Sequence, residues 1–307
     1  MLTVTVPDQD LLARVRDLSG RVELVLWDCL EPLPADLAAR VEVVQIGHYW
    51  TQPERWLRLR DLPNLRSVLL PSAGFEHALP LVPDQVTVCN GRGVHSTGTG
   101  ELAVALILAS QRGLAVALDA QREGRWATPE VPSLADRRVL VIGAGSVAQA
   151  IAERLRPFEV EITMVGRSAR PGVHGVAELP ALLPTADIVV LAVPYSPATD
   201  RLLDASALAL LPDQALVVNM ARGRVIDQDA LVAELQSGRL RAALDVTDPE
   251  PLPSTHPLWR APNTLITAHQ GGNSDATYPR VAALLRRQLE HLIAGEPLEN
   301  VVRPAAT

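Results

Sequence analysis

The chain has 307 residues, of which 48% are hydrophobic and 21% are charged, and its formal net charge is −7. This length suits about two domains with substantial cores, and the acidic balance argues against non-specific binding of nucleic acid, which needs a basic face. All 28 basic residues are arginine. Enzyme classes that depend on a Schiff-base lysine, a P-loop lysine or a kinase lysine are therefore excluded.

Features that would direct the chain to a membrane or an oxidising compartment are missing from the sequence. No apolar run approaches the roughly 20 residues that a transmembrane helix needs, and the first residues, MLTVTVPDQD, carry no basic n-region of a secretory signal. Two cysteines, Cys29 and Cys89, are too few for a disulfide framework. We expect a cytoplasmic protein that binds neither membrane nor nucleic acid.

Short β-rich runs alternate with helical stretches in the first hundred residues. Continuous apolar strands separated by helix-length segments are typical of a parallel sheet that is covered on both faces. A helix is predicted from about Thr97 to Ser110. The predicted strands cover residues 22–27, 41–47, 65–72 and 86–90.

A second strand–helix series begins at Arg137 and runs through six apolar segments to TLITAH at 264–269. Two such series predict an α/β protein with two doubly wound parallel-sheet domains. Apolar residues of the tail, from 281 to 293, recur at helical spacing, and Gly295 suits the C-cap. This tail helix can pack back on the first domain, so we predict one domain of residues 1–96 plus 280–307 and another of residues 97–279.

The stretch VIGAGSVAQA contains a glycine turn, Gly143-Ala-Gly145-Ser146-Val147-Ala148, between an apolar strand and an amphipathic helix. In a Rossmann domain the first glycine permits a tight turn, the second lets a pyrophosphate approach the backbone, and a small third residue lets helix and strand pack. The free N–H groups of the helix N-terminus favour a phosphate. We predict a dinucleotide site; a purely structural turn is the alternative.

The next strand, EITMVG, ends where an acidic residue would bind the ribose of NAD, but Arg167, Ser168 and Arg170 follow instead. Two guanidinium groups and a hydroxyl suit the 2′-phosphate that distinguishes NADP. The sequence therefore predicts that NADP(H) is preferred over NAD(H). The alternative is a solvated basic turn with no role in cofactor binding.

An arginine, a carboxylate and a histidine come at or just after the ends of three later strands. They occur in VVNMARGRVIDQDAL (217–231), AALDVTDPEPLPSTHPLW (242–259) and TLITAHQGG (264–272). That edge of an open α/β sheet is where ligands bind. Each residue alone has an ordinary structural explanation, as a surface charge, a turn residue or a satisfied histidine.

Together, and in this order after a glycine turn, these stretches resemble the D-2-hydroxyacid dehydrogenase family. The resemblance extends to LLPSAGFEHAL (69–79), NGRGVHSTGTGELAVALIL (90–108), PATDRLLD (197–204) and the terminal GEPLENVV. GRSARPG and DVTDPEPLP are most similar to glyoxylate/hydroxypyruvate reductases. The resemblance implies a Rossmann dinucleotide-binding domain (97–279) and a flavodoxin-like substrate domain, which is the discontinuous one.

The family resemblance assigns catalytic roles by position. Arg222 would bind the substrate carboxylate and the carbonyl group, for which its bidentate fork is suited. His269 would be the acid–base residue, and Glu250 would hydrogen-bond it and favour its protonated form.

Further ligands follow from the same resemblance. Tyr49 and Trp50 could enclose a small substituent, or simply belong to a core. The predicted cofactor contacts are Gly143, Gly145, Ser146, Val147, Arg167, Ser168, Arg170, Thr97, Val193, Pro194, Thr199, Ala221 and Asp245. The predicted substrate contacts are Ser72, Ala73, Gly74 and Tyr49.

These observations lead us to expect an oxidoreductase that reduces a small 2-keto acid, such as glyoxylate or hydroxypyruvate, to the D-2-hydroxy acid with hydride from NADPH. No metal is required. The resemblance also implies a homodimer. The alternatives are an NAD-linked phosphoglycerate- or phosphite-type dehydrogenase and a non-catalytic, cofactor-sensing binding protein. The physiological substrate and the role of Gln270 do not follow from the sequence.

Overall fold

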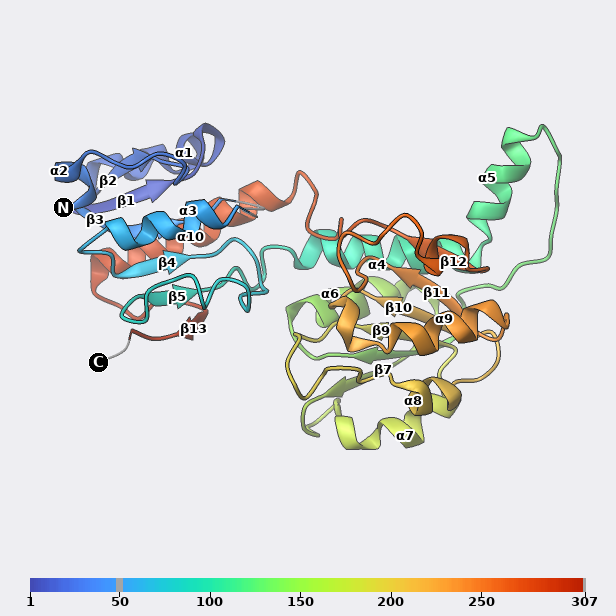
Figure 1. The fold of residues 1–307 in the computed structure, drawn as a ribbon. Helices are drawn as coiled ribbons and strands as arrows, with labels where there is room; N and C mark the ends of the chain where they lie inside the picture. Colours follow the sequence, from blue (N-terminus) through green and yellow to red (C-terminus); the bar gives the residue numbers. More distant parts are fainter. Residues whose placement is uncertain (48–51, 306–307) are drawn as a thin grey trace. The chain divides into compact units, whose positions relative to one another are not determined.

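The computed structural model describes residues 1–47 and 52–305, so the predicted substrate contact Tyr49 and its neighbour Trp50 lie outside the described residues. The chain forms two compact units. One comprises Met1–His95 and the segment that begins at Asp275, and the other is Ser96–Ser274. Each unit is built on its own sheet (Figure 1).

The sheet of the first unit has the order β13-β5-β4-β3-β1-β2, and every pairing in it is parallel except that of β13 with β5. Val41, Val43 and Val44 of β3 are fully buried, as expected for a central strand that is covered on both faces. The strands are β1 (Leu2–Val6), β2 (Val22–Leu26), β3 (Val41–Gln45), β4 (Ser67–Leu69), β5 (Thr87–Cys89) and β13 (Val301–Arg303).

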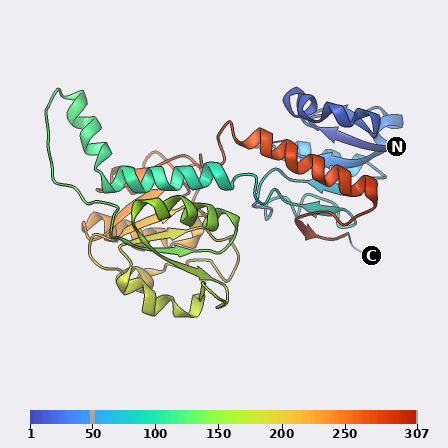
Figure 2. The same ribbon diagram turned by 180° about the vertical axis from the view of Figure 1, so that it is seen from behind.

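Helices α1 (Gln9–Val15) and α10 (Thr277–Ala294) pack together on one face of this sheet, where Leu285 and Leu289 join a core with Val4 (Figure 2). The hydroxyl of Tyr278 donates to Asp8 over 2.8 Å and ties the two helices together. Helix α10 ends at Gly295, whose φ of 72° is the left-handed C-cap conformation that the sequence predicted. The opposite face carries α2 (Ala35–Ala38) and α3 (Pro53–Leu57).

The sheet of the second unit is parallel throughout, with the order β12-β11-β10-β9-β6-β7-β8. From β6 the chain first adds β7 and β8 on one side and then β9 to β12 on the other side. Open α/β sheets bind ligands at such a point, where the order of the strands reverses. The strands are β6 (Arg138–Ile142), β7 (Glu161–Gly166), β8 (His174–Gly175), β9 (Ile188–Leu191), β10 (Leu216–Asn219), β11 (Arg241–Leu244) and β12 (Thr264–Ile266).

Two layers of helices cover this second sheet. Helices α4 (Ser96–Gln111) and α6 (Ser146–Leu155) pack on one face, and α7 (Leu179–Leu182), α8 (Ala205–Ala209) and α9 (Gln228–Gln236) pack on the other. Consecutive strand residues alternate between the two cores: Val139 and Val141 of β6 join α4 and α6, whereas Leu140 and Ile142 join the other layer. Both faces of the strands are therefore buried.

The predicted fold class, α/β with two parallel-sheet domains, is confirmed. Three strands were not predicted. β1 lies in the first six residues and was assigned no element, β8 has only two residues, and β13 follows the tail helix as an antiparallel edge strand of only three residues. Within the described residues no single helix has the length and apolar character to cross a bilayer; α4 and α5 (Leu114–Arg122) meet that test only as a pair bent by 66°.

Candidate active site

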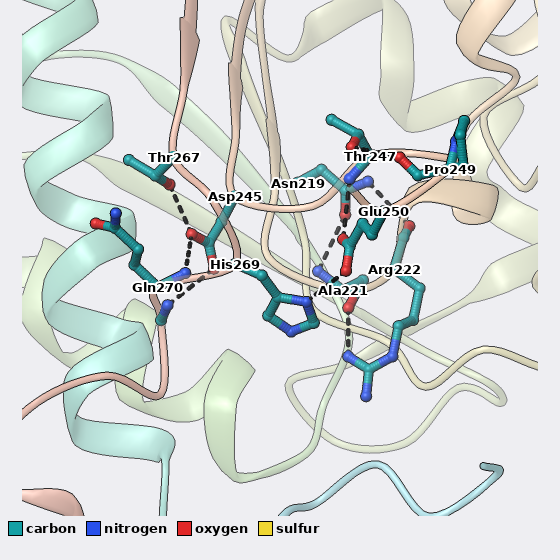
Figure 3. A network of polar contacts seen from close by, with 11 residues as sticks. Asn219, Ala221, Arg222, Asp245, Thr247, Pro249, Glu250, Thr267, His269 and Gln270 are labelled. Atoms are coloured by element: carbon teal, nitrogen blue, oxygen red, sulfur yellow. Dashed lines mark hydrogen bonds and ion pairs between the residues drawn. The ribbon is translucent and has the colours of Figure 1, made fainter. Parts of the chain in front are cut away.

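Arg222, Glu250 and His269 follow the carboxyl ends of β10, β11 and β12, which are neighbours in the parallel sheet. Parallel strands end at one edge, so the three loops emerge side by side. Figure 3 shows the three side chains converging on one region, with the Glu250 carboxylate between the imidazole and the arginine stem. The structure thus brings together the three residues that the sequence analysis selected.

His269 and Glu250 form a hydrogen-bonded pair, with 2.7 Å between Nδ1 and Oε2. The other carboxylate oxygen accepts the backbone N–H of Thr247 over 3.1 Å, which fixes the orientation of the carboxylate. Both side chains keep part of their surface exposed, 43% for His269 and 36% for Glu250. The imidazole is therefore anchored at Nδ1 while Nε2 stays available to a ligand.

Several groups act on the Glu250 carboxyl. Burial alone would raise its pKa, but the hydrogen bond and positive charge of His269, the Thr247 N–H and the Arg222 guanidinium together lower the pKa below its ordinary value of 4.5. Glu250 is therefore ionised at neutral pH and can only accept hydrogen bonds. It follows that Nδ1 of His269 carries a proton, and that Nε2 carries one only when the ring is an imidazolium.

The turn that carries Arg222 is shaped by Asn219, a buried residue at the end of β10. The Asn219 side chain donates to the carbonyl of Arg222 over 3.0 Å and accepts the N–H of Ala221 over 3.0 Å. The Arg222 guanidinium itself donates to the Ala221 carbonyl over 2.7 Å, using one of its five N–H groups. Most of its donors remain for a ligand.

Asp245, which was predicted as a cofactor contact, lies buried at the end of β11 with its carboxylate aimed at the His269 loop (Figure 3). Its oxygens accept the Thr267 hydroxyl at 2.6 Å and the N–H groups of Gln270 and Gly271 at 2.7 and 2.9 Å. Its backbone carbonyl accepts the N–H of His269 at 2.8 Å. These four bonds hold His269 at the unusual φ of 52°.

The glycine turn after β6 has the geometry that a pyrophosphate requires. Gly143 has a φ of 138°, and a Cβ at that position would overlap the carbonyl of Ala192, so only glycine fits. By contrast, a Cβ added at Gly145 would meet no other described residue within 4 Å, apart from its two chain neighbours. Gly145 caps α6, which begins at Ser146, so open space lies beside the free N–H groups of a ten-residue helix. These residues fit a dinucleotide.

Arg167 and Ser168 lie exposed just beyond β7, where the sequence analysis placed them. Within residues 1–47 and 52–305, no hydrogen bond or ion pair engages the Arg167 guanidinium. Arg170 turns back to the glycine turn and donates to the carbonyl of Ala144 over 3.4 Å. Two cationic side chains therefore stand at the ribose end of the predicted cofactor site.

Other predicted ligands have local structural tasks as well. The Thr199 hydroxyl closes its own turn by donating to the Pro194 carbonyl over 2.8 Å, and it accepts the Ser196 N–H. Val193 and Pro194 follow β9, and Ala221 is buried before Arg222. Thr97 lies in the first turn of α4. Their contacts with a cofactor stay predictions.

The predicted substrate contacts Ser72, Ala73 and Gly74 form a loop after β4 in the first unit. The Ser72 hydroxyl donates to the Gly74 carbonyl over 2.7 Å, and Asn90 donates to the Ala73 carbonyl over 2.6 Å. These bonds hold the loop by its carbonyl groups. The contacts of Ser72, Ala73 and Gly74 with a substrate stay predictions.

Asn219 and Thr267 contribute to the site without having been selected from the sequence. Each is a polar residue at the end of, or just after, an apolar strand, beside the selected arginine or histidine. That position could have identified Asn219 and Thr267 from the sequence, because a polar group at the end of a buried strand needs hydrogen-bond partners nearby. The bonds to Asp245 and Arg222 could not be read from the sequence.

The family model described as "D-isomer specific 2-hydroxyacid dehydrogenase, NAD binding domain" matches residues 104–271, which cover most of the second unit. A glyoxylate reductase/hydroxypyruvate reductase of Homo sapiens is 32% identical over 98% of this chain and 97% of its own length. A glyoxylate reductase of Thermofilum pendens is 32% identical over 76% of this chain and 74% of its own length.

A solved structure agrees over nearly the full length. The D-isomer specific 2-hydroxyacid dehydrogenase of Xanthobacter autotrophicus Py2, crystallised in complex with NADPH and MES, superposes with a TM-score of 0.81 and is 30% identical. The match covers 98% of each chain. The likeness thus includes both units and not the matched segment alone.

The lowered pKa of Glu250 makes a prediction about stability. A carboxyl whose pKa is lower in the folded than in the unfolded state stabilises the fold above its unfolded pKa, and this contribution is lost as the pH falls through the folded value. The free energy of unfolding of the wild type relative to Glu250→Gln should therefore shrink as the pH drops below about 4.5. Urea unfolding of both proteins from pH 5 to pH 3 measures this difference. A difference that grows toward acid pH would contradict the assignment.

Proposed function

We propose that this chain, which belongs to the D-isomer specific 2-hydroxyacid dehydrogenase family, reduces a small 2-keto acid of the glyoxylate or hydroxypyruvate kind to the D-2-hydroxy acid. It is an NAD(P)-dependent oxidoreductase. The observation that carries the proposal is the His269–Glu250 pair beside Arg222 at the ends of three adjacent strands.

Arg222 would bind the substrate. A 2-keto acid presents a carboxylate and a carbonyl oxygen in one plane, and a guanidinium offers parallel donors in a planar fork. One donor is held by the Ala221 carbonyl, which limits rotation of the group. Arg222 would therefore orient the keto acid and polarise its carbonyl.

His269 would supply the proton that the carbonyl oxygen needs as it becomes a hydroxyl. Because Nδ1 is bonded to Glu250, the proton must come from Nε2 of the imidazolium. Glu250 would stabilise that cation and fix the plane of the ring, and such positioned proton transfer is worth about 10²–10⁴-fold in rate. In the reverse direction the neutral ring would accept the proton from the alcohol.

When bound, a reduced nicotinamide dinucleotide supplies the hydride that the carbonyl carbon receives. Gly143, Gly145 and the first turn of α6 would hold its pyrophosphate. We propose that the cofactor is NADPH rather than NADH, because Arg167 and Arg170 stand beyond β7 and no acidic residue occupies that place. The relative crystallised with NADPH supports this preference.

An NAD-linked phosphoglycerate-type dehydrogenase is the nearest alternative, since D-3-phosphoglycerate dehydrogenase of Methanocaldococcus jannaschii is 31% identical over 71% of this chain. This chain covers only 43% of that relative's length. A cofactor-sensing protein without turnover is the other alternative. The hydrogen bond between His269 and Glu250 beside Arg222 favours the enzyme.

We also propose a homodimer, which the family resemblance implied. Helix α5 projects from the second unit (Figure 1) and exposes Leu114, Val116 and Leu118, and the segment after it leaves Trp126 97% exposed. Exposed large apolar side chains that gather on one projecting segment are a common feature of interaction surfaces. Light scattering should give twice the mass of 33.0 kDa, and a monomer at micromolar concentration would contradict this assembly.

The proposed activity is tested by offering glyoxylate, hydroxypyruvate, pyruvate and phosphohydroxypyruvate with NADPH or NADH and following nicotinamide absorbance. We expect turnover with the small unphosphorylated acids and NADPH, because the predicted site carries one substrate-binding arginine and a cationic ribose end. Turnover confined to the phosphorylated acid and NADH would favour the phosphoglycerate-type alternative. Binding of NADPH without turnover of any keto acid would favour the sensing role.

Arg167→Asp tests the cofactor preference. Loss of a hydrogen bond from a cation to phosphate, with an anion in its place, should weaken NADPH binding by about 10- to 100-fold and leave NADH binding unchanged or improved. The dissociation constants of both cofactors provide the measurement. Arg260→Asp is the matched control, since it makes the same charge change at another exposed arginine of this unit. An unaltered ratio of the two affinities in Arg167→Asp would refute the assignment.

A further inference from the structure

We propose that Gln228 is a positioning residue for the proton transfer: its side-chain amide clamps the backbone of Asp248 and thereby holds the loop that presents Glu250 to His269. This inference rests on the proposed function for the roles of Glu250 and His269. The geometry of the clamp stands on its own. Gln228 was singled out neither as a ligand nor as a catalytic residue.

The clamp consists of two hydrogen bonds between one side chain and one residue's backbone. The amide nitrogen of Gln228 donates to the carbonyl of Asp248, and its oxygen accepts the N–H of Asp248 over 2.9 Å. A planar amide that pairs with both backbone groups of a residue fixes that residue's position and orientation together, as a strand neighbour would.

The backbone of Gln228 is fixed by α9, of which it is the first residue. Asp227 caps this helix by accepting the N–H of Ala230 over 3.1 Å. His256 stands on the other side of the amide, with 3.2 Å between its Nε2 and the Gln228 nitrogen. The clamp therefore connects a fixed helix end to the loop and does not depend on a freely moving surface side chain.

From Asp248 the connection to the proposed acid–base residue is short. The preceding residue, Thr247, donates its N–H to Oε1 of Glu250 over 3.1 Å and its hydroxyl to the Pro249 carbonyl over 3.0 Å. Oε2 of Glu250 holds His269 at 2.7 Å. A displacement of Asp248 would thus move Thr247 and reorient the carboxylate that anchors the imidazole.

The loop is also confined from the side of Arg222. A Cβ added to Gly223 would overlap the carbonyl of Thr247 and would lie 2.5 Å from the N–H nitrogen of Asp248. The backbone after Arg222 therefore presses directly on the segment that Gln228 clamps. Released from the amide, that segment can only move away from Gly223, which takes Glu250 away from its place between Arg222 and His269.

Gln228→Met tests the clamp, because methionine keeps the length of the side chain and removes both hydrogen bonds. We expect kcat to fall by about 10-fold, within the roughly 100-fold that a 1 Å misplacement of a reacting group can cost, with the KM for NADPH unchanged. Gln236→Met is the matched control: the same substitution at the exposed far end of α9, where kcat should not change. If the methionine variant does not fold, Gln228→Glu keeps the shape and one of the two bonds.

A double-mutant cycle separates positioning from general stabilisation. If Gln228 acts through Glu250, then Gln228→Met should lower kcat by less than about 2-fold when it is introduced into Glu250→Gln, because the carboxylate it positions is already gone. A purely structural role would produce the same loss in both backgrounds. A 10-fold loss in both would overturn the proposal.

Residue-resolved amide hydrogen exchange measures the clamp without any turnover. In Gln228→Met the N–H groups of Asp248 and Thr247 should exchange at least about 10-fold faster, which corresponds to about 1.4 kcal/mol, and in Gln236→Met they should not. Unchanged exchange at Thr247 would overturn the proposal whatever the kinetics. If the wild type reduces no keto acid, the proposed function fails, and this exchange experiment still decides whether the clamp exists.

Discussion

The parallel pairing of β10, β11 and β12 is the constraint on which the site depends. The pairing of Asn219 with Leu244, and of Leu244 with Ile266, aligns the ends of the three strands. The three loops therefore leave the sheet at neighbouring points, although Arg222 and His269 are 47 residues apart in the sequence. The buried strands have already fixed the backbone, so bringing the three side chains together costs little further chain entropy. Contacts between the side chains alone would have to offset the whole entropy of ordering the chain.

Sheet alignment brings the loops together, and polar side chains then fix the backbone of each loop by hydrogen bonds. Asn219 shapes the turn of Arg222, Asp245 holds the segment of His269, and Gln228 holds the segment before Glu250. Each makes hydrogen bonds to backbone groups of a loop. Asn219 and Asp245 are buried, so leaving their own polar groups unpaired would cost free energy. The three proposed catalytic residues thus have a common design: each extends from a loop that is anchored by the side chain of another residue.

A second histidine–glutamate pair shows that a short hydrogen bond between these two residue types does not by itself make a candidate active site; the position of the pair in the sheet is also needed. His174 of β8 lies 2.7 Å from Glu178, as close as His269 lies to Glu250, and is similarly exposed. The pKa of Glu178 is also lowered, first by its hydrogen bond with His174. Yet His174 stands at the outer edge of the sheet, whereas His269 lies where Arg222 and the ends of β10 and β11 meet. Only the latter has a partner that could hold a keto acid.

Much of this arrangement could be predicted from the sequence. Apolar runs at strand spacing identified the parallel sheets. Arg222, Glu250 and His269 were selected because the stretches that carry them resemble the D-2-hydroxyacid dehydrogenase family. β1 was missed because no element precedes it from which an alternation of strands and helices could be recognised. β8 and β13 were missed because two or three residues show no periodicity. Asp245 was predicted as a cofactor contact; the bonds that its carboxylate makes to Thr267, Gln270 and Gly271 depend on loop conformations, which side-chain pattern does not encode.

The most direct measurement of the central claim compares His269→Ala with His174→Ala for keto-acid reduction and for NADPH binding. If Arg222, Glu250 and His269 form the reacting edge of the sheet, His269→Ala should lose at least about 100-fold in kcat and keep its affinity for NADPH. His174→Ala, which breaks an equally short pair elsewhere, should retain both. Turnover that survives in His269→Ala, or falls equally in both variants, would contradict the account.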